Sequence, residues 1–324
     1  MTKTMTYVEA IRDAQRLEME RDPNVFIAGE DVALIGSPFG QTGGILEEFG
    51  PDRILDTPIS ESQIISLGVG AAAMGLRPIV CIDFMDFIGC CTDEVVNQAA
   101  KLPYMLGGQI SLPMVIRTNI GGGINAAAQH SQCLEAMFTS IPGLKIVAGG
   151  TPADVKGLLE AAVRDNNPVL VLEHKAAGGL TGEVPEGEYL IPIGKAAVKR
   201  PGTDVTIVTY STMIYKCLAA AETLAQDGIN AEVIDLLSLV PLDKETILAS
   251  VEKTGRLVIV HEAVEFGGFG GEIAAIIADE GFDLLNAPVK RVGAPFTPVP
   301  FSATLEKNYQ PSEEKIVSVV KSLF

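Results

Sequence analysis

Short runs of β-branched and aliphatic residues alternate with amphipathic stretches along most of this chain. A run of this kind, four to eight residues long, is typical of a strand that is buried on both faces. Amphipathic stretches of about 10–15 residues between such runs predict βαβ units. The pattern therefore predicts mostly parallel sheets with helices on both faces.

The first part of the chain contains six such runs and several helical stretches. The predicted strands are 24–29, 53–56, 77–84, 112–118, 144–149 and 166–174. A T-x-x-E capping box at Thr6 and Glu9 predicts the start of the first helix. The other predicted helices follow Glu61, span 92–106, end at Ser140 and span 151–165.

A second αβ series follows a stretch rich in Gly, Pro and acidic residues. That stretch, 175–203, is interpreted as a linker with a hairpin. The predicted strands after it are 204–210, 231–237, 256–263 and 288–294, and the predicted helices are 212–227, 243–253, 270–280 and 312–323. The fold class is thus α/β, with two doubly wound domains at 1–190 and 191–324.

Composition narrows the class of protein. The chain has 324 residues and a net charge of −17, which argues against a nucleic-acid partner. Its mean hydropathy is +0.29, yet no window offers the roughly 18 apolar residues of a membrane span. Broad subunit interfaces account better for the apolar content. The N-terminus lacks the apolar core of a secretory signal, so a cytoplasmic location is expected.

Several familiar motifs are missing. The five cysteines have no C-x-x-C spacing, and we expect them to be reduced. No P-loop, G-x-G-x-x-G, G-x-S-x-G or histidine-pair metal motif occurs. We interpret "GGFGGEIAA" (267–275) as a helix entry with tight packing. "GVGAAAMG" (68–75) indicates close helix packing, either within one subunit or, preferably, at a subunit interface.

Two residues remain as candidates for chemistry. Glu61 stands at a helix start, where a carboxylate can be a cap or can serve a ligand. His130 lies in a Gly-rich loop among polar residues, where it can shuttle protons or simply pack. His261 ends a predicted strand, the usual edge for ligands, and His174 looks structural.

A set of segments, taken in order, resembles a known family. "DTPISE", "AAMGLRPIV", "NQAAK", "AAAQHSQC", "IPGLKIV" and "RDNNPV" are similar to the beta subunit of the thiamine diphosphate-dependent dehydrogenase component of 2-oxo acid and acetoin dehydrogenase complexes. The resemblance covers the whole chain. It implies a transketolase-like pyrimidine-binding domain, a transketolase C-terminal domain and an α2β2 assembly with an alpha subunit.

The resemblance also implies roles for individual residues. Glu61 would contact the aminopyrimidine ring of thiamine diphosphate, and Phe87 would stack on it. His130 would meet the substrate or assist acyl transfer to lipoyl, and Glu30 would lie between paired active sites. Met114, Ala162, Val163, Asp165 and Asn167 match a structural potassium site, although "RDNNP" also fits an ordinary helix end.

The G-D-G…N motif for diphosphate and Mg²⁺ is absent, because "QDGIN" (226–230) lacks the leading glycine. The resemblance assigns that half of the cofactor site to the alpha subunit, so the chain alone should be inactive. "RTNIGGGINAAAQHSQ", "YMLGGQ" and "LEHKA" look closer to acetoin-type members than to pyruvate-type members. A pyruvate or branched-chain 2-oxo acid dehydrogenase remains the alternative.

Two further readings stay open. The chain could mainly dock the complex, because its C-terminal domain resembles the surface that binds the dihydrolipoyl acyltransferase. The acidic balance and the terminal Phe324 suit that role. The chain could also be an unrelated α/β electron-transfer or transferase subunit, which would not depend on thiamine.

Overall fold

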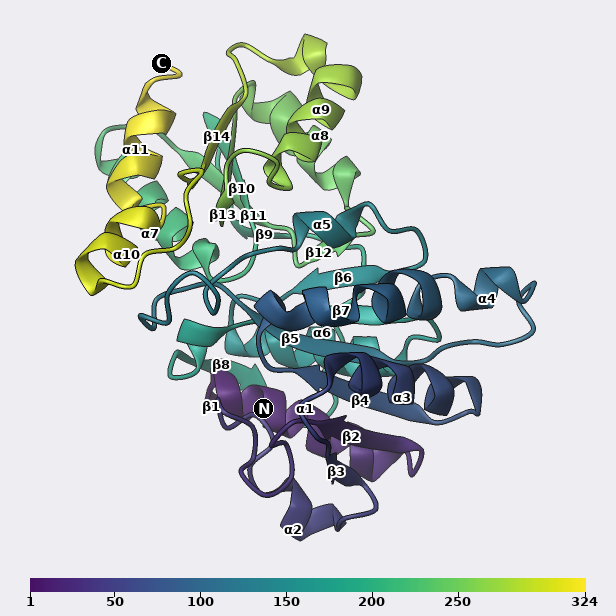
Figure 1. The fold of residues 1–324 in the computed structure, drawn as a ribbon. Helices are drawn as coiled ribbons and strands as arrows, with labels where there is room; N and C mark the ends of the chain where they lie inside the picture. The colour runs from purple at the N-terminus through teal and green to yellow at the C-terminus, as the bar shows by residue number, and fades with distance from the viewer. The chain divides into compact units, whose positions relative to one another are not determined.

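A computed structural model describes all residues, 1–324 (Figure 1). The chain forms two compact units. The first comprises residues 1–120 and 137–193, and the second comprises residues 121–136 and 194–324. The first unit was expected to be continuous up to residue 190. The short segment 121–136 instead belongs with the second unit, because Tyr210, Glu262 and Glu306 hydrogen-bond to it.

The first unit is built on a parallel sheet. Within this unit the strand order is β6-β7-β5-β4-β2-β3. The strands are β2 (Val25–Gly29), β3 (Ile54–Asp56), β4 (Arg77–Ile82), β5 (Val115–Ile120), β6 (Lys145–Ala148) and β7 (Val169–His174). Most of their residues are buried, as a parallel sheet covered on both faces requires. The six predicted strands are confirmed.

Helices cover both faces of this sheet (Figure 1). The helices of this part of the chain are α1 (Tyr7–Arg21), α2 (Ile45–Phe49), α3 (Glu61–Ala73), η1 (Met85–Cys91), η2 (Glu94–Ala99), α4 (Leu102–Met105), α5 (Ala136–Thr139), α6 (Pro152–Arg164) and η3 (Lys175–Ala177). On β4, Cys81 faces Arg117, which also binds Gln15 of α1, and the next residue back, Val80, lies against Gly68 of α3. Neighbouring strand residues point to opposite faces, so α1 and α3 cover opposite sides of the sheet.

The sequence predicts where helices start better than it predicts how long they are. The capping box at Thr6 is confirmed, with the Thr6 N–H 2.7 Å from the Glu9 carboxylate. The single helix predicted for 92–106 is wrong, because the π-helical η2 ends at Ala99 and α4 starts separately at Leu102. Pro103 has no N–H and cannot continue an existing helix. The helix predicted to reach Ser140 is only α5.

The N-terminal strand replaces the expected hairpin. β1 (Thr2–Thr6) pairs antiparallel with β8 (Thr181–Pro185) in a separate two-stranded sheet. The segment after residue 175 therefore pairs with the start of the chain and not with itself. Met5 and Val184 are the buried members of this pair of strands, which gives them an apolar face to bury.

The second unit contains a five-stranded sheet in the order β14-β13-β10-β11-β9. Its strands are β9 (Ala197–Arg200), β10 (Val205–Thr209), β11 (Ala231–Asp235), β13 (Leu257–Val264) and β14 (Lys290–Ala294), and the short β12 (Ser238–Val240) also belongs to this unit. β9 is an antiparallel edge strand, while the other four strands are parallel. Four of these strands were predicted; β9 and β12 were not.

The helices of the second unit are α7 (Met213–Gln226), α8 (Lys244–Thr254), α9 (Gly270–Glu280), η4 (Phe282–Leu284), α10 (Ala303–Tyr309) and α11 (Glu313–Lys321). α7 and α11 pack on one face of the sheet around a core that includes Ile207, Ala220 and Ile316. On the other face, Thr206 hydrogen-bonds Ser250 and Thr254 of α8. The four predicted helices are confirmed, and α10 was not predicted.

Two glycine stretches show what their small residues do. A Cβ on Gly68 would lie 2.9 Å from Val80 and Met114, so Gly68 lets α3 approach its own sheet. Gly70 faces open space. Gly268 and Gly270 lie against the His261 ring, which confirms that "GGFGGEIAA" serves helix entry and tight packing. None of the helices combines the length and the apolar character that a bilayer crossing requires.

Candidate functional site

A cavity in the first unit lies where β2 and β4 end and α3 begins. Its volume is about 100 Å³. It is lined by Glu30, Pro38, Glu61, Ile64, Cys81, Ile82, Asp83, Phe84 and Phe87. The carboxyl edge of an open α/β sheet is where such folds bind ligands. Three residues singled out from the sequence, Glu30, Glu61 and Phe87, are thus brought together.

Three carboxylates meet in this cavity because of where the elements end. Glu30 directly follows β2 and Asp83 directly follows β4, and these two strands are parallel neighbours. Glu61 is the first residue of α3, and Ser60 before it makes no side-chain cap hydrogen bond. Negative charge is favourable at that helix start. The arrangement leaves the cavity strongly acidic.

Burial and the neighbouring carboxylates raise the pKa of two of these groups, Asp83 and Glu30. The pKa of Asp83 is raised to about 7, mainly by burial and then by the nearby Glu30, against the opposing effect of Arg117. Burial also raises the pKa of Glu30, with smaller contributions from Asp31 and Glu61. A group that titrates near neutrality can either donate or accept a hydrogen bond, which suits acid–base work.

Aromatic side chains also line the cavity. The rings of Phe84 and Phe87 meet edge to face with centroids 5.8 Å apart, and Phe39 contacts Phe84 at 5.5 Å. Such a wall suits a flat ring, and the carboxylates suit a ligand with N–H groups or positive charge. The residues present therefore fit an aromatic nitrogen heterocycle such as an aminopyrimidine.

A buried polar network holds the end of β4, next to the cavity, in place. The Asn119 side chain donates to the Asp83 carbonyl at 2.9 Å and accepts from Gln41 at 3.0 Å. Gln41 in turn reaches Glu173, which Arg117 binds through two hydrogen bonds of 2.6 and 2.8 Å. Arg117 and Glu173 are both buried. This network fixes the end of β4 and hence Asp83.

His130 belongs to the other unit. It lies in the loop 121–136, and its side chain is partly exposed. Its backbone N–H donates to the Ala127 carbonyl at 3.4 Å. Residues on both sides of it line a cavity of about 510 Å³ within the second unit, together with Glu262 and Tyr309. His261 is buried, and burial lowers its pKa to about 4, so it stays neutral at physiological pH. His174 is buried too, and its Nδ1 accepts from the Ala176 N–H, which fits a structural role.

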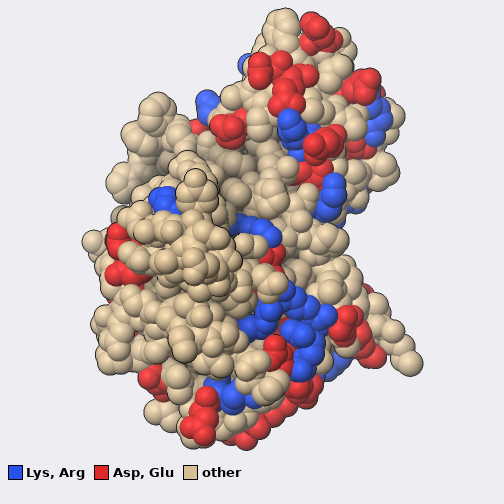
Figure 2. Space-filling view, turned by 90° about the vertical axis from the view of Figure 1, so that its right-hand side faces the viewer, with Lys and Arg blue, Asp and Glu red and all other residues tan.

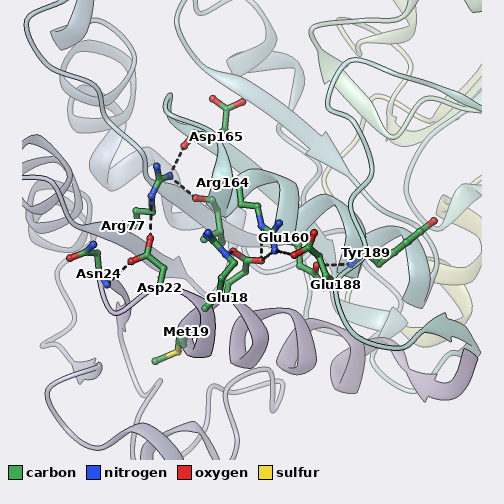
Figure 3. Close-up of polar contacts among 12 residues, drawn as sticks. Glu18, Met19, Asp22, Asn24, Arg77, Glu160, Arg164, Asp165, Glu188 and Tyr189 are labelled. Carbon is green, nitrogen blue, oxygen red and sulfur yellow. Dashed lines mark hydrogen bonds and ion pairs between the residues drawn. The ribbon is translucent and has the colours of Figure 1, made fainter. Parts of the chain in front are cut away.

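Two of the residues expected to hold potassium, Val163 and Asp165, already bind positive side chains. Arg77 donates to the carbonyl oxygens of Val163 and Asp165 at 2.9 and 3.2 Å (Figure 3). The Asp165 carboxylate also binds Lys145 and the Asn167 side chain. The carbonyls of Met114 and Ala162 accept backbone N–H groups. This donor set does not fit a further cation, so the potassium site stays a prediction without support from the geometry.

Sequence reasoning missed three carboxylates. Asp83 could have been found, because it ends the predicted strand 77–84 at the ligand-binding edge. Glu262 follows His261 at the end of another predicted strand and carried the same signal. Glu306 had none, because the helix that carries it was not predicted. Within the described chain no cluster of three or more His, Cys, Asp or Glu residues could hold a metal ion.

Comparison with known proteins decides the family. Residues 3–179 match the model of the transketolase pyrimidine-binding domain, and residues 194–316 match that of the transketolase C-terminal domain. The acetoin:2,6-dichlorophenolindophenol oxidoreductase subunit beta of Bacillus subtilis is 48% identical, with 100% of this chain and 98% of that protein covered. The chain belongs to this family of dehydrogenase beta subunits.

Other beta subunits of the family are similarly close. The Cupriavidus necator acetoin:2,6-dichlorophenolindophenol oxidoreductase subunit beta is 48% identical over 99% of this chain and 98% of its own length. The B. subtilis 2-oxoisovalerate dehydrogenase subunit beta is 46% identical over 98% of both chains. These matches confirm the predicted family and place the chain among subunits of oxidoreductases.

A solved structure bears on the fold. A split-gene transketolase, described as an inactive beta4 tetramer, superposes with a TM-score of 0.81 at 24% identity and covers 98% of both chains. The predicted transketolase-like fold of two α/β domains is thereby confirmed. The pyrimidine-binding domain and the family together imply dependence on thiamine diphosphate.

Proposed function

We propose that this chain is the beta subunit of a thiamine diphosphate-dependent dehydrogenase component that cleaves acetoin or oxidatively decarboxylates a 2-oxo acid and delivers the acyl group to lipoyl. The observation that carries the proposal is the cavity of the pyrimidine-binding domain, where Glu30, Glu61 and Asp83 face Phe84 and Phe87. Both the carboxylates and the aromatic wall match the chemistry of an aminopyrimidine ring.

Glu61 is the central residue of the proposed mechanism. When bound, thiamine diphosphate supplies the carbon nucleophile that attacks the substrate carbonyl. The Glu61 carboxylate would accept a hydrogen bond from a ring nitrogen of the bound pyrimidine and would favour the form that carries a proton there. Its place at the first residue of α3 fixes it on a rigid element. General acid–base assistance of this kind is worth about 10²–10⁴-fold in rate.

The other cavity residues orient the ring and exclude water. Phe87 and Phe84 line the cavity and would give a bound pyrimidine an apolar surface to pack on. Glu30 and Asp83 carry raised pKa values and retain a proton more readily than free carboxyl groups do. Asp83, with a pKa of about 7, can therefore donate to a ring acceptor when it holds its proton.

His130 is proposed to act on the substrate side. A partly exposed imidazole in a polar loop can donate to developing negative charge on a carbonyl oxygen or assist acyl transfer to lipoyl. This assignment rests on the resemblance of "AAAQHSQC" and not on a contact with Glu61.

A second subunit is needed to complete the site. The chain lacks the G-D-G…N motif, so we propose that an alpha subunit holds the diphosphate and Mg²⁺ in an α2β2 assembly. Large apolar side chains are exposed on α3, on α4 and just after them: Leu67, Met74, Leu76, Tyr104, Met105 and Leu106. Figure 2 shows wide surface areas with neither acidic nor basic side chains. Such surfaces favour burial against partner subunits.

The C-terminus is the proposed contact for the acyltransferase core. The Phe324 ring lies under the Arg256 guanidinium at 4.2 Å but is 58% exposed. The last residue is thus held in place while much of its surface stays available. With a net charge of −17, the chain suits a basic partner domain. Assembly in the cytoplasm would agree with this partnership.

Acetoin is the favoured substrate. The loop "RTNIGGGINAAAQHSQ" favours acetoin-type members, and two of the relatives at 48% identity are named for acetoin. Pyruvate and branched 2-oxo acids remain the alternatives, since a 2-oxoisovalerate dehydrogenase beta subunit is 46% identical.

The test is to co-express the chain with its alpha subunit and measure dye reduction on acetoin, pyruvate and 2-oxoisovalerate with thiamine diphosphate and Mg²⁺. We expect thiamine-dependent turnover that is highest on acetoin. Glu61→Gln should lower kcat by about 10²–10⁴-fold while assembly with the alpha subunit survives. The chain without its partner should show no turnover.

A matched control is Glu47→Gln, which changes an exposed glutamate of α2 in the same unit and should leave kcat unchanged. Normal turnover by Glu61→Gln would refute the catalytic assignment. A complex that assembles but acts on none of the three substrates would refute the proposed reaction and favour the docking role.

A further inference from the structure

The loop that carries His130 has an unusual backbone. Gly121, Gly123, Asn125 and Ala127 have φ values of 82°, 92°, 57° and 63°, so every second residue is in the left-handed region. Asparagine tolerates this conformation, whereas alanine adopts it at a cost. Alternation of this kind forms a nest, in which successive backbone N–H groups point inward and bind an anion.

Two buried carboxylates fill this nest. The Gly122 N–H donates to Glu262 at 2.7 Å, and the N–H groups of Gly123 and Asn125 donate to the two oxygens of Glu306 at 2.8 and 2.9 Å. Glu306 is 3% exposed and Glu262 is 8% exposed. The short distances are those of hydrogen bonds to charged acceptors, which are about twice as strong as neutral ones.

The fit between loop and carboxylate is close. A Cβ on Gly122 would lie 2.7 Å from Oε1 of Glu306, so only glycine leaves that oxygen in place. The Gln310 side chain, one turn after Glu306, donates to the Glu262 carboxylate at 3.1 Å, while its backbone N–H donates to the Glu306 carbonyl. The far end of the loop is fixed as well, because the Tyr210 hydroxyl donates to the buried Glu135 at 2.6 Å.

We infer that Glu306, with Glu262, is a positioning residue: it holds the 121–136 loop in its left-handed conformation and thereby sets the place of His130. The inference rests on the proposed function, which gives His130 its role. Glu306 touches neither cofactor nor substrate in this scheme. Without the carboxylate, at least one of the N–H groups of Gly123 and Asn125 loses its acceptor, and the loop loses contacts that offset its backbone strain.

The test is a double-mutant cycle in the complex assembled with the alpha subunit. Glu306→Gln keeps the size of the side chain but replaces one acceptor oxygen with a donor. A displacement of about 1 Å at a reacting group can cost about 10²-fold, and we expect kcat to fall by that factor. In the His130→Ala background the same change should cost nothing more, because Glu306 acts through His130.

Gly122→Ala provides a second variant that leaves both carboxylates in the chain. It should displace the Glu306 carboxylate and lower kcat in the same direction as Glu306→Gln, with no further loss when the two are combined. Glu252→Gln, on an exposed position of α8 in the same unit, is the matched control and should behave as the unchanged enzyme. If Glu306→Gln does not fold, Gly122→Ala alone decides the outcome.

Hydrogen exchange separates this inference from the proposed function. Backbone amides of residues 121–127 should exchange faster in Glu306→Gln, while peptides from the first unit should not change. Unchanged exchange in that loop, or losses in kcat that multiply with those of His130→Ala, would overturn the inference. Full activity of both Glu61→Gln and His130→Ala would instead overturn the proposed function, and the exchange result would still decide whether Glu306 holds the loop.

Discussion

In the first unit Glu30, Glu61 and Asp83 share one cavity with one another, whereas in the second unit Glu262 and Glu306 each bind backbone N–H groups. In both units these carboxylates are at least partly buried and lose part of their hydration. Those of the second unit recover hydrogen bonds from the loop that they bind. Those of the first unit line one cavity together with aromatic side chains. Burial first, and the neighbouring carboxylates second, raise the pKa values of Glu30 and Asp83.

The two sets of carboxylates differ in what they can do: one set can bind a ligand, and the other holds a loop in place. A carboxylate with satisfied oxygens holds its surroundings still, because removing it leaves several donors unpaired. Carboxylates that repel one another are stabilised when a cationic or N–H-bearing ligand enters. The acidic cavity of the first unit is therefore the better candidate for ligand binding. In the second unit Glu262 and Glu306 already bind the N–H groups of the 121–136 loop. Four changes test this contrast, in order of expected effect.

The largest effect is expected for Arg117→Met. Arg117 pairs with Glu173 below the acidic cavity, and both side chains are almost fully buried. Removing the cation leaves an uncompensated buried charge, which costs about 3–5 kcal/mol of unfolding free energy. Urea unfolding curves measure it. A loss below about 1 kcal/mol would mean that Glu173 reaches water and that the first unit is less desolvated than the contrast requires.

Asp83→Asn should stabilise the protein, but only at neutral and alkaline pH. The pKa of Asp83 is raised from 3.8 in the unfolded chain to about 7 in the folded protein. Between these values the folded state holds the extra proton, so stability falls as pH rises from about 4 to about 7. The shift corresponds to at most about 4 kcal/mol.

The measurement compares thermal or urea unfolding of both proteins at pH 4 and pH 8. The two should be similar in stability at the lower pH, and Asp83→Asn should be more stable at the higher pH. Parallel pH profiles would show that Asp83 is ionised without penalty and that the carboxylates of the cavity do not repel one another.

Arg164→Met has the next largest expected effect. Arg164 donates from Nε and Nη2 to the buried Glu18 of α1 at 2.9 and 2.6 Å, and it ties α6 to α1 (Figure 3). Glu18 keeps a second partner, Arg21, at 2.8 Å. We therefore expect a loss of about 1.5–3 kcal/mol, the usual range for a hydrogen bond to a charged group. Urea unfolding measures this loss, and no change would show that Arg21 alone satisfies Glu18.

Lys244→Met should have the smallest effect. Lys244 pairs with Glu280 at 2.7 Å, but the two side chains are 42% and 40% exposed. Pairs of this kind contribute about 0–1 kcal/mol. Urea unfolding should show almost no loss of stability. This exposed ion pair therefore serves as the reference for the buried pairs above. A loss comparable to that of Arg164→Met would show that burial is not what separates them.

The sequence predicts the fold well wherever a local pattern decides it. The predicted strand 77–84 contains an uninterrupted apolar run at 78–82, and Thr6 with Glu9 forms a capping box that needs no distant partner. Elements that depend on distant residues were missed. β1 pairs with residues 181–185, which lie far from it in the sequence, and the residues Thr2–Thr6 alone do not predict that pairing.

The candidate site divides in the same way. Glu61, Glu30 and Phe87 came from the family resemblance, and the structure gathers them in one cavity. Asp83 was within reach from its place at a strand end. Glu306 was not, because its meaning depends on a loop almost two hundred residues earlier in the chain. The potassium ligands show the reverse: a sequence match by itself could not reveal that Arg77 donates to two of the carbonyls.

The anchoring of the 121–136 loop by Glu262 and Glu306 also sets an order of events at the ribosome. The loop is translated long before either anchor. At about 5–20 residues per second, a nascent chain waits roughly ten to forty seconds between Asn125 and Glu306. During that interval the first sheet can form, but the segment bearing His130 has no carboxylate to organise it. The final shape of that loop is therefore decided only when the last helices emerge.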